Sequence, residues 1–143
     1  MIRLIGTGCM ILLLTGCGST TLAGLKSKPE AKYEFDAPMS AEATYALIAS
    51  PALNCFESDS WAASWYTEAE RNADQHSGRF ILSKTSWITR YYALIEVVPK
   101  AASTTGAHVT VWTDRADLQH LGPAAEHWAN GKAMSGERMA DCN

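Results

Sequence analysis

Residues 79–113 decide the fold, because they hold three β-strand patterns in a row. These strands are predicted at 79–86 (RFILSKTS), 88–98 (ITRYYALIEVV) and 108–113 (HVTVWT). The middle stretch is dense in aromatic and β-branched residues, which favour strands, and Pro99 ends it. In the last stretch Val109 and Val111 alternate with other residue types, so one face of this strand is expected to be buried. Strands that follow one another across short turns predict an antiparallel meander.

The segment before this meander is ambiguous. Trp61 and Trp65 lie four residues apart, which suits a helix, whereas alternation from Trp65 onward suits a strand. We favour a strand over residues 63–71, because the turn-rich residues 72–78 (NADQHSG) then join it to the next strand as a long-loop hairpin.

Helices are expected before and after the meander in the sequence. A short strand at 33–36 is followed by a helix that begins after Ser40 as N-cap and is broken or ended by Pro51. A second helix is predicted at 123–130, with Pro123 in its first turn and Gly131 in a left-handed conformation past its end. Its buried stripe is expected to contain Ala125, Trp128 and Ala129.

This order, β-α-β-β-β-β-α, predicts an α+β two-layer sandwich. An antiparallel sheet of about five strands would carry the helices on one face, in a single domain over residues 33–143 of the 143-residue chain. The formal net charge of -3 leaves no broad basic surface for nucleic acid.

The N-terminus has the pattern of an export signal. Arg3 precedes an apolar stretch of about ten residues, Ile5 to Leu14, which is shorter than the ~20 that span a bilayer. The stretch ends in Leu14-Thr15-Gly16-Cys17, which resembles the lipobox of bacterial lipoproteins. Cys9 is a competing site, but the apolar stretch before it is too short.

The lipobox resemblance implies a membrane address. Residues 1–16 would be a signal peptide removed by signal peptidase II, and Cys17 would carry two or three acyl chains as the membrane anchor. Gly18 stands where Asp would retain a lipoprotein in the inner membrane, so the outer membrane is expected, with the domain in the periplasm. Residues 17–32, small and polar, are expected to form a flexible tether that lifts the domain off the bilayer.

The rest of the chain also resembles small bacterial lipoproteins of uncharacterised function. The shared features are the lipobox Cys17, the strand and helix from Tyr33 to Cys55, the meander from Arg79 to Thr113, the segment Trp128-Ala129-Asn130-Gly131, and Cys142. This resemblance implies an architecture and an address, and it implies no activity.

Two cysteines remain after Cys9 leaves with the signal and Cys17 is lipidated. Cys55 and Cys142 are expected to form a disulfide in an oxidising compartment, and two free thiols are the alternative. The bond would close a loop of about 87 residues, for which chain entropy gives roughly 4–5 kcal/mol.

Catalytic and metal-binding motifs are absent from the sequence, so we predict no catalytic residues, no metal and no cofactor. The four histidines, His76, His108, His120 and His127, do not form an HExxH motif, and no G-x-S-x-G elbow is present. The carboxylate pairs Glu68/Glu70 and Glu57/Asp59 would each share a strand face, where a solvated surface is a simpler explanation than acid–base catalysis.

The aromatic residues are the remaining clue to function. Trp112 is expected on the sheet face that the helices leave uncovered, together with one of Tyr91 and Tyr92, and such a patch suits a protein partner. Burial of these rings in the core is the alternative. We therefore predict a membrane-anchored, non-enzymatic module that binds a protein partner or supports envelope assembly. A carrier of a small apolar ligand or lipid, and a hydrolase without a recognisable motif, remain alternatives.

Overall fold

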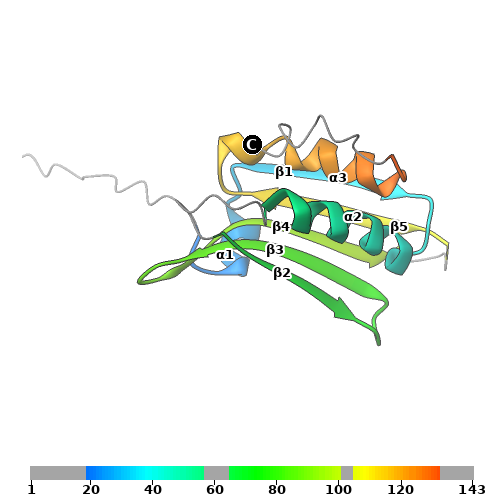
Figure 1. Ribbon diagram of the computed structural model, residues 1–143, viewed down its shortest axis with the longest axis horizontal. Coiled ribbons are helices and arrows are strands. Elements are labelled where there is room, and N and C mark those ends of the chain that lie inside the picture. Colours follow the sequence, from blue (N-terminus) through cyan, green and yellow to red (C-terminus); the bar gives the residue numbers. More distant parts are fainter. Residues whose placement is uncertain (1–18, 57–64, 101–104, 133–143) are drawn as a thin grey trace, which may run out of the picture.

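The computed structural model describes residues 19–56, 65–100 and 105–132, which form one sheet with helices packed on it (Figure 1). The five strands are β1 (Ala31–Ala37), β2 (Trp65–Asn72), β3 (Ser77–Thr85), β4 (Thr89–Pro99) and β5 (Ala107–Thr113). They are all antiparallel and lie in the order β1-β5-β4-β3-β2. The predicted α+β class with a five-stranded antiparallel sheet is confirmed.

The predicted strands match the observed ones closely. The meander of β3, β4 and β5 is continuous, and the favoured strand at 63–71 corresponds to β2 over the described residues. The stretch 33–36 lies in β1, which pairs along its whole length with β5, from Ala31 opposite Thr113 to Ala37 opposite Ala107. Strand β1 is therefore hydrogen-bonded to β5, the last strand of the sheet in the sequence.

Two helices, α2 (Ala41–Phe56) and α3 (Leu121–Ala129), pack on one face of the sheet. The core between the layers is apolar and includes Ile48, Phe80, Ile95, Val109, Val111, Ala125, Trp128 and Ala129. The predicted caps are confirmed: Ser40 Oγ accepts a hydrogen bond from the Ala43 N–H at 3.3 Å, and Gly131 has a φ of +69°. A short 3-10 turn, η1 (Ala116–Leu118), precedes α3.

The prediction that Pro51 breaks or ends the first long helix is wrong. Helix α2 continues through Pro51 to Phe56. A proline inside a helix removes one backbone hydrogen bond and costs about 3 kcal/mol. The helix continues because its buried stripe continues, since Ala52 and Cys55 both pack into the core. Tertiary packing thus outweighs the local preference.

The predicted flexible tether is also wrong for the described residues 19–32. A short helix, α1 (Leu22–Ser27), begins after Thr21, whose Oγ1 accepts a hydrogen bond from the Gly24 N–H at 2.9 Å. Leu25 of α1 is fully buried against Ile81 and Leu94, on the sheet face opposite α2 and α3. Leu25 and the partly buried Leu22 are few apolar contacts in a small and polar segment, which is why the composition alone indicated a tether.

Gly78 lets the start of β3 lie directly under α2. A Cβ atom at this position would sit 2.4 Å from the ring of Tyr45. The hydroxyl of Tyr45 donates to the backbone carbonyl of Arg79 at 3.4 Å, and burial raises the pKa of Tyr45. The β2–β3 hairpin is therefore fixed to the helical layer.

Candidate functional site

The sheet face opposite α2 and α3 carries a row of polar side chains across all five strands. The pairing register places Glu70, Arg79, Glu96, Thr110 and Glu34 side by side from β2 to β1. Side chains alternate along a strand, so these five point to the same face. Helix α1 covers only the neighbouring region of this face, around Leu94 and Trp112.

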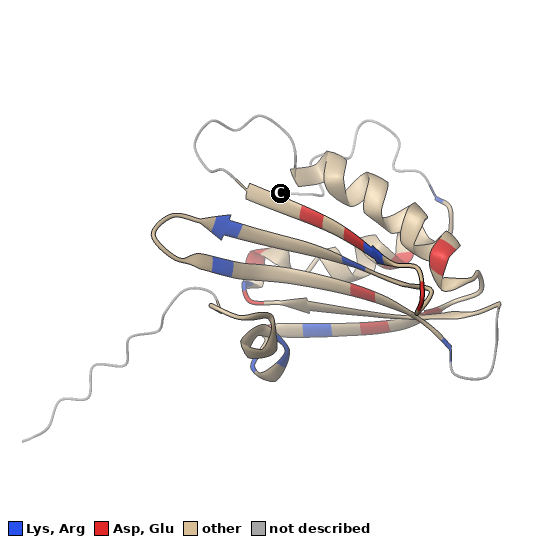
Figure 2. Cartoon of the chain, turned by 90° about the horizontal axis from the view of Figure 1, so that it is seen from below, with Lys and Arg blue, Asp and Glu red and all other residues tan. Residues whose placement is uncertain are grey.

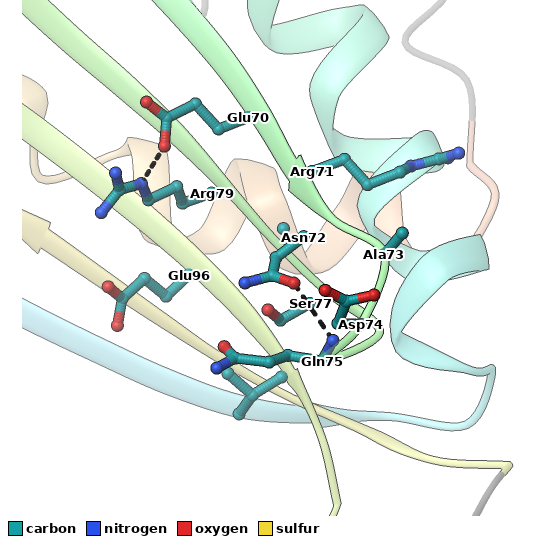
Figure 3. A pocket seen from close by; sticks show the side chains of 11 residues that line it. Glu70, Arg71, Asn72, Ala73, Asp74, Gln75, Ser77, Arg79 and Glu96 are labelled. Atoms are coloured by element: carbon teal, nitrogen blue, oxygen red, sulfur yellow. Dashed lines mark hydrogen bonds and ion pairs between the residues drawn. The ribbon is translucent and has the colours of Figure 1, made fainter.

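A polar groove lies in the uncovered part of this face. It has a volume of about 870 Å³. The residues that line and define this polar groove are Glu70, Arg71, Asn72, Ala73, Asp74, Gln75, Ser77, Gly78, Arg79, Glu96 and Val98 (Figure 3). The groove is open to solvent and is lined by charged and amide side chains, so it suits a polar surface of another molecule.

Charges in the polar groove are arranged in pairs. Arg79 Nε donates to Glu70 Oε2, and this hydrogen bond raises the pKa of Arg79 (Figure 3). Glu96, on the next strand, accepts from Lys26 Nζ of α1 at 2.6 Å. Arg79 therefore lies between two carboxylates, one paired across the hairpin and one paired to α1. The arrangement presents fixed donors and acceptors rather than an isolated charge.

The β2–β3 turn forms the end wall of the polar groove. Asn72 Oδ1 accepts from the Gln75 N–H at 3.1 Å, which closes an Asx-type turn. His76 follows with a φ of +46°, a left-handed conformation that is uncommon outside glycine. On the other side of this turn, Arg71 Nη1 lies 3.2 Å from Glu42 Oε1 of α2. The turn is thus stabilised by an internal hydrogen bond and by an ion pair with helix α2.

A second polar cluster lies at the β1 edge of the same face. Asp36 pairs with Lys100 Nζ at 2.5 Å and with His108 Nδ1 at 2.9 Å, and these partners lower the pKa of Asp36. Lys32 Nζ lies 2.9 Å from Glu34 Oε1 and is the main cause of the lowered pKa of Glu34. His108 Nε2 is 3.6 Å from Glu34, so both ring nitrogens of His108 face carboxylates. This cluster joins β1 to β5 as an exposed ion-pair network.

Trp112 and one of the two candidate tyrosines, Tyr91, lie on the sheet face opposite α2 and α3, as the sequence predicts, but helix α1 partly covers them. Tyr92 is buried among the α2 and α3 core, where its ring packs edge-on against Trp65 at 5.2 Å. Tyr91 and Trp112 lie on the opposite face, half-buried beside α1, and Lys26 Nζ lies 5.0 Å from the Trp112 ring. A register shift in the β3–β4 pairing, opposite Tyr92, interrupts the alternation of β4, so Tyr91 lies on the same face as Leu94 while Tyr92 joins the core. Helix α1, which the sequence did not predict, covers Tyr91 and Trp112.

Cys55 takes part in a disulfide bond at the end of α2. Its predicted partner Cys142 lies outside the described residues, as does Cys17, so the pairing and the lipid attachment stay predictions. The carboxylate pair Glu57/Asp59 also lies outside the described residues.

The remaining candidate residues are dispersed. His76 is in the β2–β3 turn, His108 is in β5, His120 precedes α3, and His127 is exposed near the end of α3. In the described part of the chain, no three His, Cys, Asp or Glu side chains are placed to hold a metal ion. Glu68 and Glu70 do share the exposed face, but Glu70 is paired with Arg79.

Within the described ranges 19–56, 65–100 and 105–132, the longest helix is α2. No helix there is both long and apolar enough to cross a bilayer, and α2 reaches only 16 residues.

Sequence reasoning does not find the two residues that organise the polar groove, Arg79 and Glu96. Arg79 forms no run with other basic residues, so composition and spacing give it no special weight. The signal is its strand register, which brings residues distant in sequence into one row.

Known proteins give no further guidance. No protein family matches the chain, and no curated protein or solved structure is significantly similar to it. The resemblance to small lipoproteins therefore rests on the residues quoted for it.

Proposed function

We propose that this chain is a lipid-anchored, non-enzymatic binding module of the bacterial envelope, and that the polar groove is where a partner protein binds. The observation that carries this proposal is the groove itself, a hollow of about 870 Å³ with its charged side chains held in pairs. Fixed, solvent-open donors and acceptors suit recognition of a polar protein surface.

The packing of the domain favours this function over a carrier. An apolar cargo would need an apolar cavity between the sheet and the helices. That layer is filled by fully buried side chains, such as Phe80, Leu82 and Ile95. The polar groove is on the other face of the sheet and has a polar lining. A polar protein surface is therefore the better match for the hollow that the described residues form.

Two observations support the proposed location. The lipobox Leu14-Thr15-Gly16-Cys17 supports attachment to a membrane through acyl chains, and Gly18 after it favours the outer membrane, with the domain in the periplasm. The disulfide of Cys55 supports an oxidising compartment, because such bonds are rare in reducing cytoplasm. The lipobox supports the lipid anchor, and the disulfide supports export. Each of these two proposals can be tested without the other.

Site-specific photo-crosslinking in intact cells tests the polar groove. A photoreactive side chain at Gln75, which lines the groove, is expected to form a crosslink to one protein at a reproducible mass. The same side chain at Gln119, an exposed residue outside the groove, is the matched control and is expected to form none. The double change Glu70→Arg with Arg79→Glu keeps an ion pair but inverts its direction, and it is expected to abolish the Gln75 crosslink. Equal crosslinking from both positions would contradict the proposed site.

Cysteine variants test the location. Cys17→Ala is expected to release the domain from the membrane fraction.

Cys55→Ser and Cys142→Ser are expected to lower the free energy of unfolding by the same amount, about 2–5 kcal/mol for loss of a native disulfide. Unequal losses measured by denaturant unfolding would show that these two cysteines are not partners.

A further inference from the structure

The tip of the β3–β4 hairpin exposes large apolar side chains to solvent. Trp87 is 100% exposed and Ile88 is 56% exposed. The hairpin is closed below them by Thr85 opposite Thr89, whose hydroxyl oxygens lie 3.1 Å apart. Trp87 and Ile88, which we name the apolar tip, are therefore presented by a short, closed turn. Nothing in the core accounts for a tryptophan at this position.

The charged residues nearest to the apolar tip in the sequence are basic. Residues 80–95 contain no Asp or Glu, and their charged residues are Lys84 and Arg90. These two are direct cross-strand neighbours at the base of the tip, one on each strand of the hairpin (Figure 2). The combination of tryptophan, isoleucine and basic residues is complementary to an anionic lipid surface.

The start of the described chain lies at this same end of the sheet. The Ser19 carbonyl accepts a hydrogen bond from the Tyr91 N–H at 2.7 Å, and Tyr91 is three residues after Ile88. Cys17 precedes Ser19 by two residues, which can span at most roughly 7 Å. A lipid on Cys17 would therefore attach beside the β3–β4 hairpin. Figure 1 shows α1, which follows Ser19, next to that hairpin.

We propose that the apolar tip inserts into the surface of the anionic bilayer that holds the lipid anchor. This inference rests on the proposed attachment at Cys17. Trp87 and Ile88 enter the interface between headgroups and acyl chains, where tryptophan is favoured, while Lys84 and Arg90 contact lipid phosphates. The domain then has two membrane contacts and a fixed orientation. The β2–β3 turn, at the other end of β3, is held roughly 30 Å from the bilayer surface.

Quenching of tryptophan fluorescence by brominated lipids tests this contact. The full-length protein isolated from its membranes is reconstituted into phosphatidylcholine and phosphatidylglycerol vesicles with brominated acyl chains. The wild-type protein is expected to be quenched, and Trp87→Tyr is expected to lose most of the quenching, because tyrosine keeps the insertion but removes the fluorophore. Trp112→Tyr, on the same sheet but half-buried under α1, is the matched control and is expected to keep the quenching. Quenching that survives Trp87→Tyr would overturn the proposal.

The charge requirement is measured in the same vesicles. Lys84→Gln with Arg90→Gln is expected to reduce quenching when phosphatidylglycerol is present. Quenching that does not depend on these residues would overturn their proposed role. The intact mass of the same sample reports the anchor separately. A mass without acyl chains refutes the lipid attachment, whereas an acylated protein without Trp87 quenching refutes only the insertion of the apolar tip.

Discussion

The two hairpins at the ends of β3 are built on opposite principles. At one end, the β2–β3 turn is polar, is closed by the Asn72–Gln75 hydrogen bond, and lies against α2 through Gly78 and Tyr45. At the other end, the β3–β4 turn projects from the sheet and exposes Trp87 completely. The same strand therefore runs from a turn fixed by the fold to a turn that the fold leaves uncovered.

This difference separates residues that serve stability from residues that serve contact. The β2–β3 hairpin has a packing reason for its glycine and its tyrosine, and its polar side chains form the polar groove. Packing gives no reason for the tryptophan of the β3–β4 hairpin, since its side chain contributes nothing to the core. Variants in the two hairpins should consequently affect different measurements, with the largest losses of stability in the β2–β3 hairpin and the smallest at the apolar tip.

Among the variants in the two hairpins, Gly78→Ala is expected to have the largest effect on stability. The new Cβ would lie 2.4 Å from the Tyr45 ring, so either α2 or β3 must shift. Overpacking of this kind lowers the free energy of unfolding by about 1–3 kcal/mol. Denaturant unfolding measures the loss, and Ser86→Ala in the other hairpin is the control that is expected to unfold like the wild type. A neutral Gly78→Ala would show that the β2–β3 hairpin is not fixed to α2.

Arg79→Gln is expected to have a smaller effect on stability. It removes the ion pair with Glu70 on an exposed sheet face, and such pairs contribute about 0.2–1 kcal/mol. The double variant Glu70→Gln with Arg79→Gln should lose no more than this, because neither charge is then left without its partner. If thermal unfolding shows a much larger loss, Arg79 supports the fold as well as the polar groove.

Acid should weaken the β1 edge of the grooved face and leave the β3–β4 hairpin unaffected. The pKa values of Asp36 and Glu34 are lowered in the folded state, so the unfolded chain takes up protons at a higher pH than the folded chain. The stabilisation is fully present above the unfolded pKa values, near 4, and is lost as the pH falls through the folded ones. Asp36→Asn is expected to flatten this part of the stability–pH curve. An unchanged curve would exclude Asp36 as a source of acid sensitivity.

Replacing the apolar tip is expected to affect stability least. Trp87→Ser with Ile88→Ser removes exposed side chains, so the free energy of unfolding should stay within about 0.5 kcal/mol of the wild type. The same variant should lose the membrane contact of the hairpin. A marked loss of stability would place Trp87 in a structural role and weaken the contrast between the hairpins.

The sequence predicts the elements with strong local patterns. The strands β4 and β5 follow from residue type and alternation, and α3 follows from Pro123, Gly131 and the buried stripe that ends in Ala129. Helix α1 escapes prediction because it is short and its contacts, through Leu25, Leu22 and the Lys26–Glu96 pair, are tertiary. The continuation of α2 past Pro51 depends on tertiary packing, which local preference does not encode.

The candidate site is less predictable than the fold. The polar groove depends on register, because Glu70, Arg79 and Glu96 belong to three strands and become neighbours only when the strands pair. The apolar tip has a partial signal, since Trp87 stands between the strand patterns at 79–86 and 88–98, and Ile88 is the first residue of the second pattern. Alternation alone, however, does not distinguish a tryptophan at a turn from one in the core.

The pairing of β1 with β5 sets the order in which the molecule can fold. Residue 31 pairs with residue 113, so β1 lacks its strand partner until β5 has been synthesised. Contacts this distant in sequence slow folding, because a long loop must close before they form. An N-terminal strand that pairs with the last strand therefore leaves the sheet incomplete until β5 is available.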